Sequence, residues 1–122
     1  MIGAMSLEAT DGLQIDLRPG LKPDVAVLKV IGPLTIRNFF GFQDATRSNK
    51  ERVLIVDLAE VPFMDSAALG SALGLHVSCE KNGRKYALVN VSPRLQTLFT
   101  VCGVQDVLVT FPTVQEAEAA LA

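Results

Sequence analysis

The sequence predicts a single α/β domain in which helices pack on a mostly parallel sheet with an antiparallel hairpin at its N-terminal edge. After the second predicted strand, strand-like and helix-like segments alternate, which is typical of parallel sheets. The run Val53–Leu58 is apolar enough to be buried on both faces, as central parallel strands are. The chain has 122 residues, of which 49% are hydrophobic and 20% charged, so it fits one domain with a real core.

The first two strands are predicted to form the edge hairpin. Leu13–Leu17 alternates apolar and polar residues, which indicates a half-buried strand. Turn residues at Pro19-Gly20 and Lys22–Asp24 separate it from Val25–Ile31, the second strand. Gly32-Pro33 ends that strand.

The next helix is predicted to run from Thr35, which can cap it, to about Asn49. Ile36, Phe39 and Phe40 then fall on or near its apolar face. The buried strand Val53–Leu58 follows this helix.

The second half of the chain continues the alternation of helices and strands. The predicted elements are a helix Asp65–Asn82 stopped by Gly83, a strand Lys85–Val91, a helix opened by Ser92-Pro93 and ended at Gly103, a strand Val107–Val109, and a helix Ala117–Leu121 opened by a capping box at Thr113–Glu116. Each helix therefore has its own start or stop residues.

The segment Phe63–Gly70 is the most informative part of the sequence. It takes the chain from the buried strand into a helix that opens on Asp65-Ser66. The first backbone N–H groups of a helix have no partner within the helix and favour negative charge. A hydroxyl next to a carboxylate at this position makes Ser66 the candidate for a chemical switch.

The helix from Asp65 carries two stripes of different character. Leu69, Ala72, Leu73 and His76 recur at helical spacing and are predicted to face the sheet. The other stripe consists of small residues: Ala67, Gly70, Ser71, Gly74 and Ser78. Gly costs about 1 kcal/mol of helix stability relative to Ala. The small stripe is therefore either a close internal packing face or a docking surface for a partner protein.

Composition and motifs argue against several functions. The net charge is −2 with no basic stripe, which argues against nucleic acid binding. No stretch is long and apolar enough for membrane insertion and no signal peptide is evident, so a cytoplasmic protein is expected. Phosphate-loop, dinucleotide and nucleophile-elbow motifs are absent, so no enzyme activity and no cofactor are predicted. Cys79 and Cys102 lack metal-ligand spacing, so no metal is predicted.

Two ionisable residues have structural and functional interpretations. His76 falls on the inward stripe, which favours a hydrogen-bonded core histidine over a catalytic base. Asp57 lies near the end of the buried strand and could be structural or functional.

Most of the chain, residues 13–121, resembles a STAS domain, the fold of bacterial anti-sigma factor antagonists. The matching features are Val53–Leu58, Phe63-Met64-Asp65-Ser66 with Leu69-Gly70, Asn82-Gly83, Val91-Ser92-Pro93, and Leu98-Phe99 before Gly103-Val104. Upstream, Val30–Thr35 resembles the family's strand that ends in Gly-x-Leu-Asp. Residues 1–12 are left as an N-terminal extension of uncertain order.

The resemblance implies a function for Ser66 and its surroundings. In such antagonists, the serine after the aspartate is phosphorylated by a partner that is both a serine kinase and the anti-sigma factor. The unmodified antagonist binds this partner and frees the sigma factor for transcription, and a phosphatase is a further candidate partner. The residues implied in partner binding, besides Ser66, are Thr35, Asp65, Ala67, Gly70, Ser71 and Gly74. The oligomeric state is left open.

The sequence also departs from the family's pattern. Ala67 and Ala68 stand where the pattern has Ser/Thr-Gly, and Thr35 stands where it has Asp. A STAS protein without a phosphorylation switch, such as a scaffold, a transporter accessory subunit or a nucleotide-responsive module, is therefore the main alternative. A phosphoreceiver centred on Asp57 is a weaker one, because it needs an early acidic pair and a late lysine where Phe111 stands.

Overall fold

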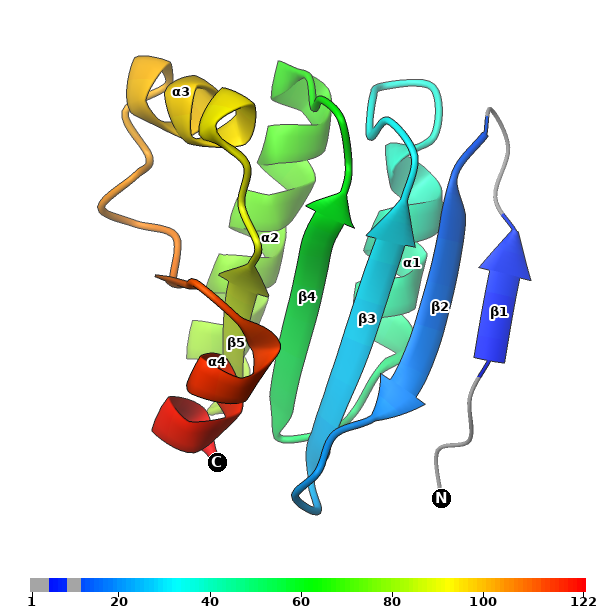
Figure 1. The fold of residues 1–122 in the computed structure, drawn as a ribbon, viewed down its shortest axis with the longest axis vertical. Helices are drawn as coiled ribbons and strands as arrows, with labels where there is room; N and C mark the ends of the chain where they lie inside the picture. Colours follow the sequence, from blue (N-terminus) through cyan, green and yellow to red (C-terminus); the bar gives the residue numbers. More distant parts are fainter. Residues whose placement is uncertain (1–4, 9–11) are drawn as a thin grey trace.

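The computed structural model describes residues 5–8 and 12–122, which form one sheet with helices packed against it (Figure 1). Its elements are β1 (Met5–Glu8), β2 (Gln14–Pro19), β3 (Val25–Ile31), α1 (Phe39–Ser48), β4 (Val53–Glu60), α2 (Ser66–Asn82), β5 (Lys85–Val89), α3 (Pro93–Val101), β6 (Thr110–Phe111) and α4 (Val114–Leu121). The strands lie side by side in chain order, β1 to β6. The predicted α/β fold class is confirmed.

The sheet is antiparallel at its N-terminal edge and parallel elsewhere. β1 pairs antiparallel with β2, and β2 pairs antiparallel with β3. From β3 to β6, each strand is parallel to its neighbour. The hairpin is therefore confirmed, and β1 is an additional strand within the segment that the sequence left as an extension. Residues 1–4 and 9–11 of that extension lie outside the described residues.

The central strands place alternate side chains on two separate cores. Helices α1 and α2 cover one face of the sheet, α4 covers part of the other, and α3 lies beyond the carboxyl ends of the strands (Figure 1). Leu54 and Val56 belong to the larger core, towards α1 and α2, whereas Val53 and Ile55 belong to the smaller core with Ala117 of α4. All six residues from Val53 to Leu58 are buried, as predicted for a central strand.

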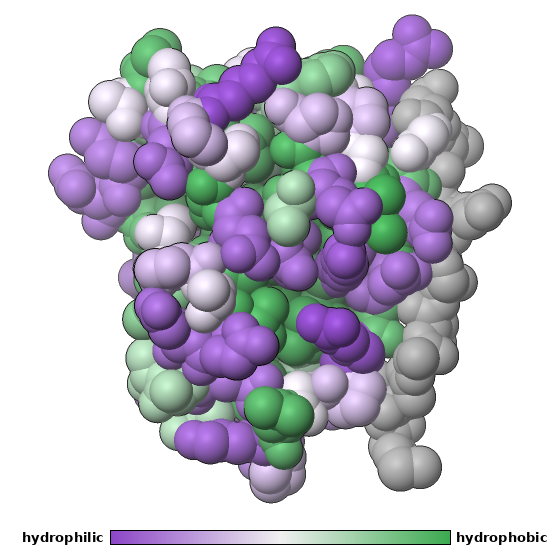
Figure 2. Space-filling model, viewed as in Figure 1, coloured by the Kyte–Doolittle hydropathy of each residue, from purple (hydrophilic) through white to green (hydrophobic). Residues whose placement is uncertain are grey.

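On the face of the sheet that carries α4, no described helix covers β2 and β3. The surface of these two strands is polar there. Figure 2 shows mostly hydrophilic residues on this face. Lys29 of β3 forms an ion pair with Glu60 across 2.7 Å. Asp16 of β2 pairs with Lys29 in register, whereas Ile15 and Leu13 point into the larger core. This alternation is what an antiparallel pair with one solvated face requires.

Helix α4 is tied to the β2–β3 turn by one buried carboxylate. Glu118 is only 4% exposed, and its two oxygens accept hydrogen bonds from the backbone N–H groups of Leu21 and Lys22, at 3.1 and 3.0 Å. No motif in the sequence points to Glu118. Its role depends on a contact between two segments that lie almost a hundred residues apart in the sequence, and no local sequence pattern indicates such a contact.

Most predicted helix ends are confirmed. Asp65 caps α2, Ser92 caps α3 and Thr113 caps α4, each accepting a hydrogen bond from a backbone N–H of the first turn. Gly83 adopts the left-handed conformation, with φ of 68°, at the end of α2.

Two predicted elements are misplaced, and β5 ends at Val89 rather than at Val91. Helix α1 begins at Phe39 rather than at Thr35, because residues 35–38 form a turn in which the side chain of Asn38 accepts the N–H of Thr35 at 2.9 Å. Ile36 and Phe40 are consequently 64% and 63% exposed instead of facing the core. The last strand is residues 110–111, not 107–109.

Candidate functional site

Ser66 lies where two loops meet. The β3–α1 loop and the β4–α2 loop touch through a parallel bridge between Leu34 and Met64. The N–H of Leu34 donates to the carbonyl of Phe63 at 3.1 Å, and the N–H of Asp65 donates to the carbonyl of Leu34 at 3.2 Å. Ser66 follows as the first residue of α2 and is exposed. The site is therefore built on backbone contacts between two strand ends.

Glycine is required where the first of these loops leaves the sheet. Gly32 has φ of 109°, and a Cβ atom there would lie 2.5 Å from the backbone oxygen of Gly12. A side chain would therefore be strained and would also collide with backbone. This close approach fixes the path of the β3–α1 loop towards Asp65.

The carboxylate of Asp65 joins both loops to the helix. Its Oδ1 accepts the N–H of Ala68 at 3.0 Å, which is the helix cap. Its Oδ2 accepts the N–H of Ile36 at 2.8 Å, across 29 residues of sequence. Both oxygens are therefore engaged, and Asp65 holds the backbone of Ile36 near the start of α2.

The hydroxyl of Ser66 makes no hydrogen bond to any described residue, so it is available to a reaction partner. It sits among the outward-pointing N–H groups of the first turn of α2, which favour negative charge. Thr35, also predicted for the site, is half-buried in the adjoining turn, and its Oγ1 accepts the N–H of Arg37 at 3.2 Å. The structure thus brings Thr35, Asp65 and Ser66 together.

The small-residue stripe of α2 is divided by the packing of α1. Gly70 and Gly74 are exposed, and a Cβ atom at either position would meet nothing within 4 Å. Close internal packing therefore does not explain these glycines. Ala67 is half-buried beside them.

Ser71 is not on the exposed surface, and its predicted place there is wrong. It is 5% exposed, and its hydroxyl donates to the carbonyl of Ala68 at 2.6 Å. Ser71 lies three residues after Ala68 and four before Leu75, and all three are buried. At helical spacing these positions share one face, and that face turns towards the core.

Three exposed apolar side chains lie on the two loops and at the start of α1. Ile36 and Phe40 belong to the turn and first helical turn after Leu34, and Phe63 precedes Met64 in the other loop. Phe63 is 40% exposed, and the guanidinium of Arg94 lies over its ring at 5.6 Å. The exposure of Ile36 and Phe40 was not predicted, because helical spacing from Thr35 places both on or near an apolar face.

His76 and Asp57 have structural surroundings. His76 Nδ1 lies 2.7 Å from Tyr86 Oη and its Nε2 lies 3.0 Å from Glu80, so the predicted hydrogen-bonded histidine is confirmed. Burial raises the pKa of the Tyr86 phenol. Asp57 is buried, and its Oδ1 accepts hydrogen bonds from the side chain of Asn90 at 2.9 Å and the N–H of Ala59 at 3.0 Å.

Within the described ranges, 5–8 and 12–122, no group of acidic, His and Cys side chains is placed to hold a metal ion. Over the same ranges, no helix is both long and apolar enough to cross a bilayer. The site is thus defined by a free hydroxyl, an occupied carboxylate and an open, small-residue helix face.

Fold and site together define a class of α/β domain, with an N-terminal antiparallel hairpin, a parallel remainder and a polar loop-to-helix site after the central strand. The chain belongs to the STAS domain family, whose model matches residues 20–117. This membership removes the phosphoreceiver alternative.

The chain is similar in sequence to curated anti-sigma factor antagonists. The anti-sigma-B factor antagonist of Listeria monocytogenes is 38% identical over 56 residues, which are 46% of this chain and 49% of that protein. The chain therefore spans about half the length of the curated relatives that it matches.

Solved structures show the same fold at low identity. An anti-sigma factor antagonist from Mycobacterium paratuberculosis superposes with a TM-score of 0.77 at 20% identity, covering 94% of this chain and 98% of that one. The Bacillus protein SpoIIAA, solved in a phosphorylated form, superposes with a TM-score of 0.63 at 21% identity, covering 87% of this chain and 97% of that one.

Proposed function

We propose that this protein is an anti-sigma factor antagonist that binds an anti-sigma factor with serine kinase activity and is released when Ser66 is phosphorylated. The observation that carries the proposal is the unpartnered hydroxyl of Ser66 at the exposed start of α2, beside the open face of Gly70 and Gly74. Binding of the unmodified protein would free a sigma factor and so regulate transcription. The curated relatives named as anti-sigma-B factor antagonists support this assignment.

The chemistry of the site fits a switch that acts on the complex rather than on the fold. A phosphate on Ser66 adds about −1.5 to −2 charges at neutral pH. The start of α2 tolerates this charge because the helix dipole favours it. A partner packed against Asp65 and Gly70 would instead meet new bulk and a second negative group next to a carboxylate. Phosphorylation therefore weakens binding without unfolding the domain.

The proposed partner-binding surface consists of residues from both loops and from the exposed stripe of α2. Its members are Thr35, Ile36, Phe40, Phe63, Asp65, Ser66, Ala67, Gly70 and Gly74. The three exposed apolar side chains supply area that can be desolvated, and the two glycines permit close backbone approach. Buried Ser71 is not part of this surface.

Phosphorylation of Ser66 can be tested by intact mass. After incubation with the partner kinase and ATP, the wild-type protein is expected to gain the mass of one phosphate, and Ser66→Ala is expected to gain none. Ser78→Ala, a half-buried serine on the same helix, is the matched control and should be modified like the wild type. A phosphate that persists in Ser66→Ala would contradict the proposed switch.

The docking face can be tested with Gly74→Arg. A side chain at Gly74 meets nothing within 4 Å, and Arg is a better helix former than Gly by about 0.5–1 kcal/mol, so the fold should be slightly stabilised. Binding to the anti-sigma factor is expected to weaken at least about tenfold, as for the loss of roughly 1.4 kcal/mol.

Isothermal titration calorimetry measures this affinity, with thermal unfolding as the check on the fold. Gln115→Arg, which is exposed on α4 and lies outside the proposed surface, is the matched control. Equal affinities for Gly74→Arg and Gln115→Arg would refute the docking face. Weakened binding by Gly74→Arg together with an unmodified Ser66 would instead indicate a STAS scaffold without the switch.

A further inference from the structure

Lysine and arginine gather at one end of the sheet. Strands β3, β4 and β5 begin side by side, with Val25 paired to Val53 and Val53 to Lys85. The β2–β3 turn, the end of α1 and the end of α2 lie at this same end of the domain (Figure 1). Residues 20–24, 47–52 and 80–85 hold seven of the 11 lysines and arginines: Lys22, Arg47, Lys50, Arg52, Lys81, Arg84 and Lys85. These seven residues form the basic end of the domain.

Acidic residues do not neutralise the basic end. Its segments contain Asp24, Glu51 and Glu80, and buried Glu118 lies against the β2–β3 turn, so seven cations meet four carboxylates in a chain whose net charge is −2. Among the residues that the structure describes, none of the seven cations has a carboxylate within ion-pair distance. All of them except half-buried Arg84 are exposed. The excess of positive charge therefore faces solvent.

Backbone hydrogen bonds hold the three segments of the basic end together. The N–H of Val53 donates to the carbonyl of Asp24 at 3.0 Å, and the N–H of Lys85 donates to the carbonyl of Arg52 at 2.9 Å. The cations are spread over more than sixty residues of sequence, from Lys22 to Lys85, so no basic stripe is visible in the sequence. Folding alone collects them into one charged surface.

An apolar side chain stands at the tip of the basic end. Leu21, in the β2–β3 turn directly before Lys22, is 88% exposed. The turn is closed by the N–H of Gly20, which donates to the carbonyl of Val25 at 2.8 Å, and Glu118 accepts the N–H groups of Leu21 and Lys22. A single exposed leucine is ordinary on a protein surface. Here a fixed turn displays it beside exposed cations, which is the combination that anchors peripheral proteins to lipid.

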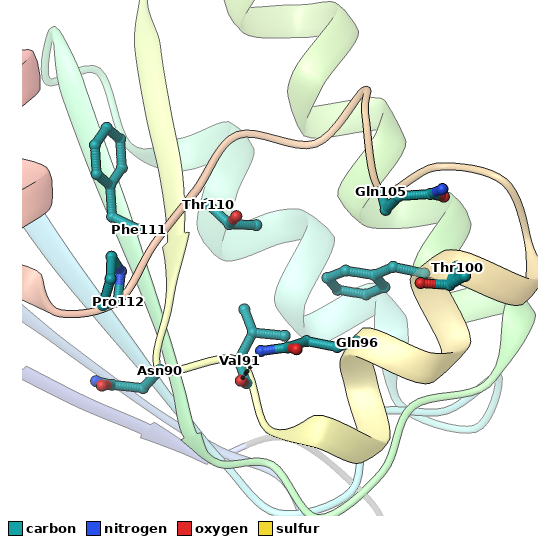
Figure 3. A pocket seen from close by; sticks show the side chains of 9 residues that line it. Asn90, Val91, Gln96, Thr100, Gln105, Thr110, Phe111 and Pro112 are labelled. Atoms are coloured by element: carbon teal, nitrogen blue, oxygen red, sulfur yellow. Dashed lines mark hydrogen bonds between the residues drawn. The ribbon is translucent and has the colours of Figure 1, made fainter.

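The opposite end of the sheet has different chemistry. Ser66 lies there, at the start of α2 and beyond the carboxyl end of β4. The hollow beside α3 lies at that end too, and its lining residues, among them Gln96, Thr100 and Gln105 in Figure 3, include no ionisable side chain. A partner held at the basic end therefore leaves Ser66 accessible.

We propose that the basic end, with Leu21 at its tip, binds the surface of an anionic lipid bilayer. Negatively charged headgroups attract the cations, and Leu21 reaches the boundary between headgroups and acyl chains. A nucleic acid would use the cations but would leave Leu21 in water. Bound in this way, the domain lies on the membrane without spanning it, and it turns Ser66 away from the lipid.

The proposal can be tested by co-sedimentation of the full chain with lipid vesicles. Vesicles of equal parts phosphatidylglycerol and phosphatidylcholine are expected to bind the protein at least about tenfold more tightly than vesicles of phosphatidylcholine alone, as for two or more cations at an anionic surface. Added salt should weaken this binding, because it screens exposed charges. The assay contains no anti-sigma factor, so its failure would leave the proposed function standing.

Matched variants at the two ends of the sheet locate the lipid-binding surface. Arg52→Glu should weaken binding at least about fivefold, which corresponds to about 1 kcal/mol for one cation, whereas Arg94→Glu changes the net charge equally on α3 and should bind like the wild type. Leu21→Ser should weaken binding roughly tenfold through lost apolar burial, whereas Val101→Ser, at a residue 78% exposed on α3, should not. Thermal unfolding checks that each variant is folded.

Three results would overturn the proposal. The first is equal binding to vesicles with and without phosphatidylglycerol. The second is equal binding of Arg52→Glu and Arg94→Glu, which would show that only net charge matters. The third is a Leu21→Ser variant that binds as tightly as Val101→Ser, which would indicate a general site for polyanions rather than a lipid surface.

Discussion

Replacing Asp65 with Ala is expected to lower the free energy of unfolding by about 2–4 kcal/mol. The substitution removes the cap of α2 and also the acceptor for the N–H of Ile36, so two backbone donors lose a charged partner at once. A helix cap alone contributes about 1 kcal/mol. The additional loss measures the link between the β3–α1 loop and α2, and urea unfolding provides the measurement.

Two variants separate these contributions. Ser92→Ala removes a cap that serves only its own helix, and it should cost about 1 kcal/mol. Asp65→Asn keeps one acceptor oxygen and should fall between the wild type and Asp65→Ala. If Asp65→Ala cost no more than Ser92→Ala, the hydrogen bond to Ile36 would contribute nothing to the stability of the site.

Replacing Glu118 with Ala is expected to lower the free energy of unfolding by at least about 3 kcal/mol, because each of the two lost hydrogen bonds to this charged group contributes about 1.5–3 kcal/mol. The N–H groups of Leu21 and Lys22 both lose their acceptor. Hydrogen exchange at these two amides should accelerate more than exchange in β4, since the loss is confined to the β2–β3 turn and α4.

Glu116→Ala is the matched control for Glu118→Ala. Glu116 lies on the same helix but is exposed, and its substitution should change stability by less than about 0.5 kcal/mol. Glu118→Gln retains one acceptor oxygen and should recover part of the loss. Equal unfolding free energies for Glu118→Ala and Glu116→Ala would show that α4 does not depend on this carboxylate.

Local features of the sequence were sufficient for the helix ends and the central strand. Asp65, Ser92 and Thr113 cap their helices with side chains that reach only three residues ahead, so their chemistry is visible in a short window of sequence. Gly83 ends α2 for a similarly local reason. The burial of Val53–Leu58 could be predicted from this segment alone, because every side chain in it is apolar except that of Asp57.

The boundaries that failed depend on contacts between distant segments. Residues 35–38 resemble the start of a helix, but Leu34 forms a β-bridge with Met64, and the N–H of Ile36 donates a hydrogen bond to Asp65. Those contacts hold the chain in a turn, so that α1 begins only at Phe39 and Ile36 and Phe40 are exposed. Propensity is a weak prior, and tertiary contacts override it here.

The sequence by itself determined the fold class, the position of Ser66 at a helix start and the presence of two glycines nearby, because these follow from local pattern and spacing. Only the tertiary structure decided which small residues of α2 are exposed. Packing of α2 against the sheet and against the neighbouring α1 buries Ser71 and leaves Gly70 and Gly74 open. It also decided the partners of Asp65 and Glu118, since a carboxylate's hydrogen-bond donors can come from any segment that folding brings within 3 Å.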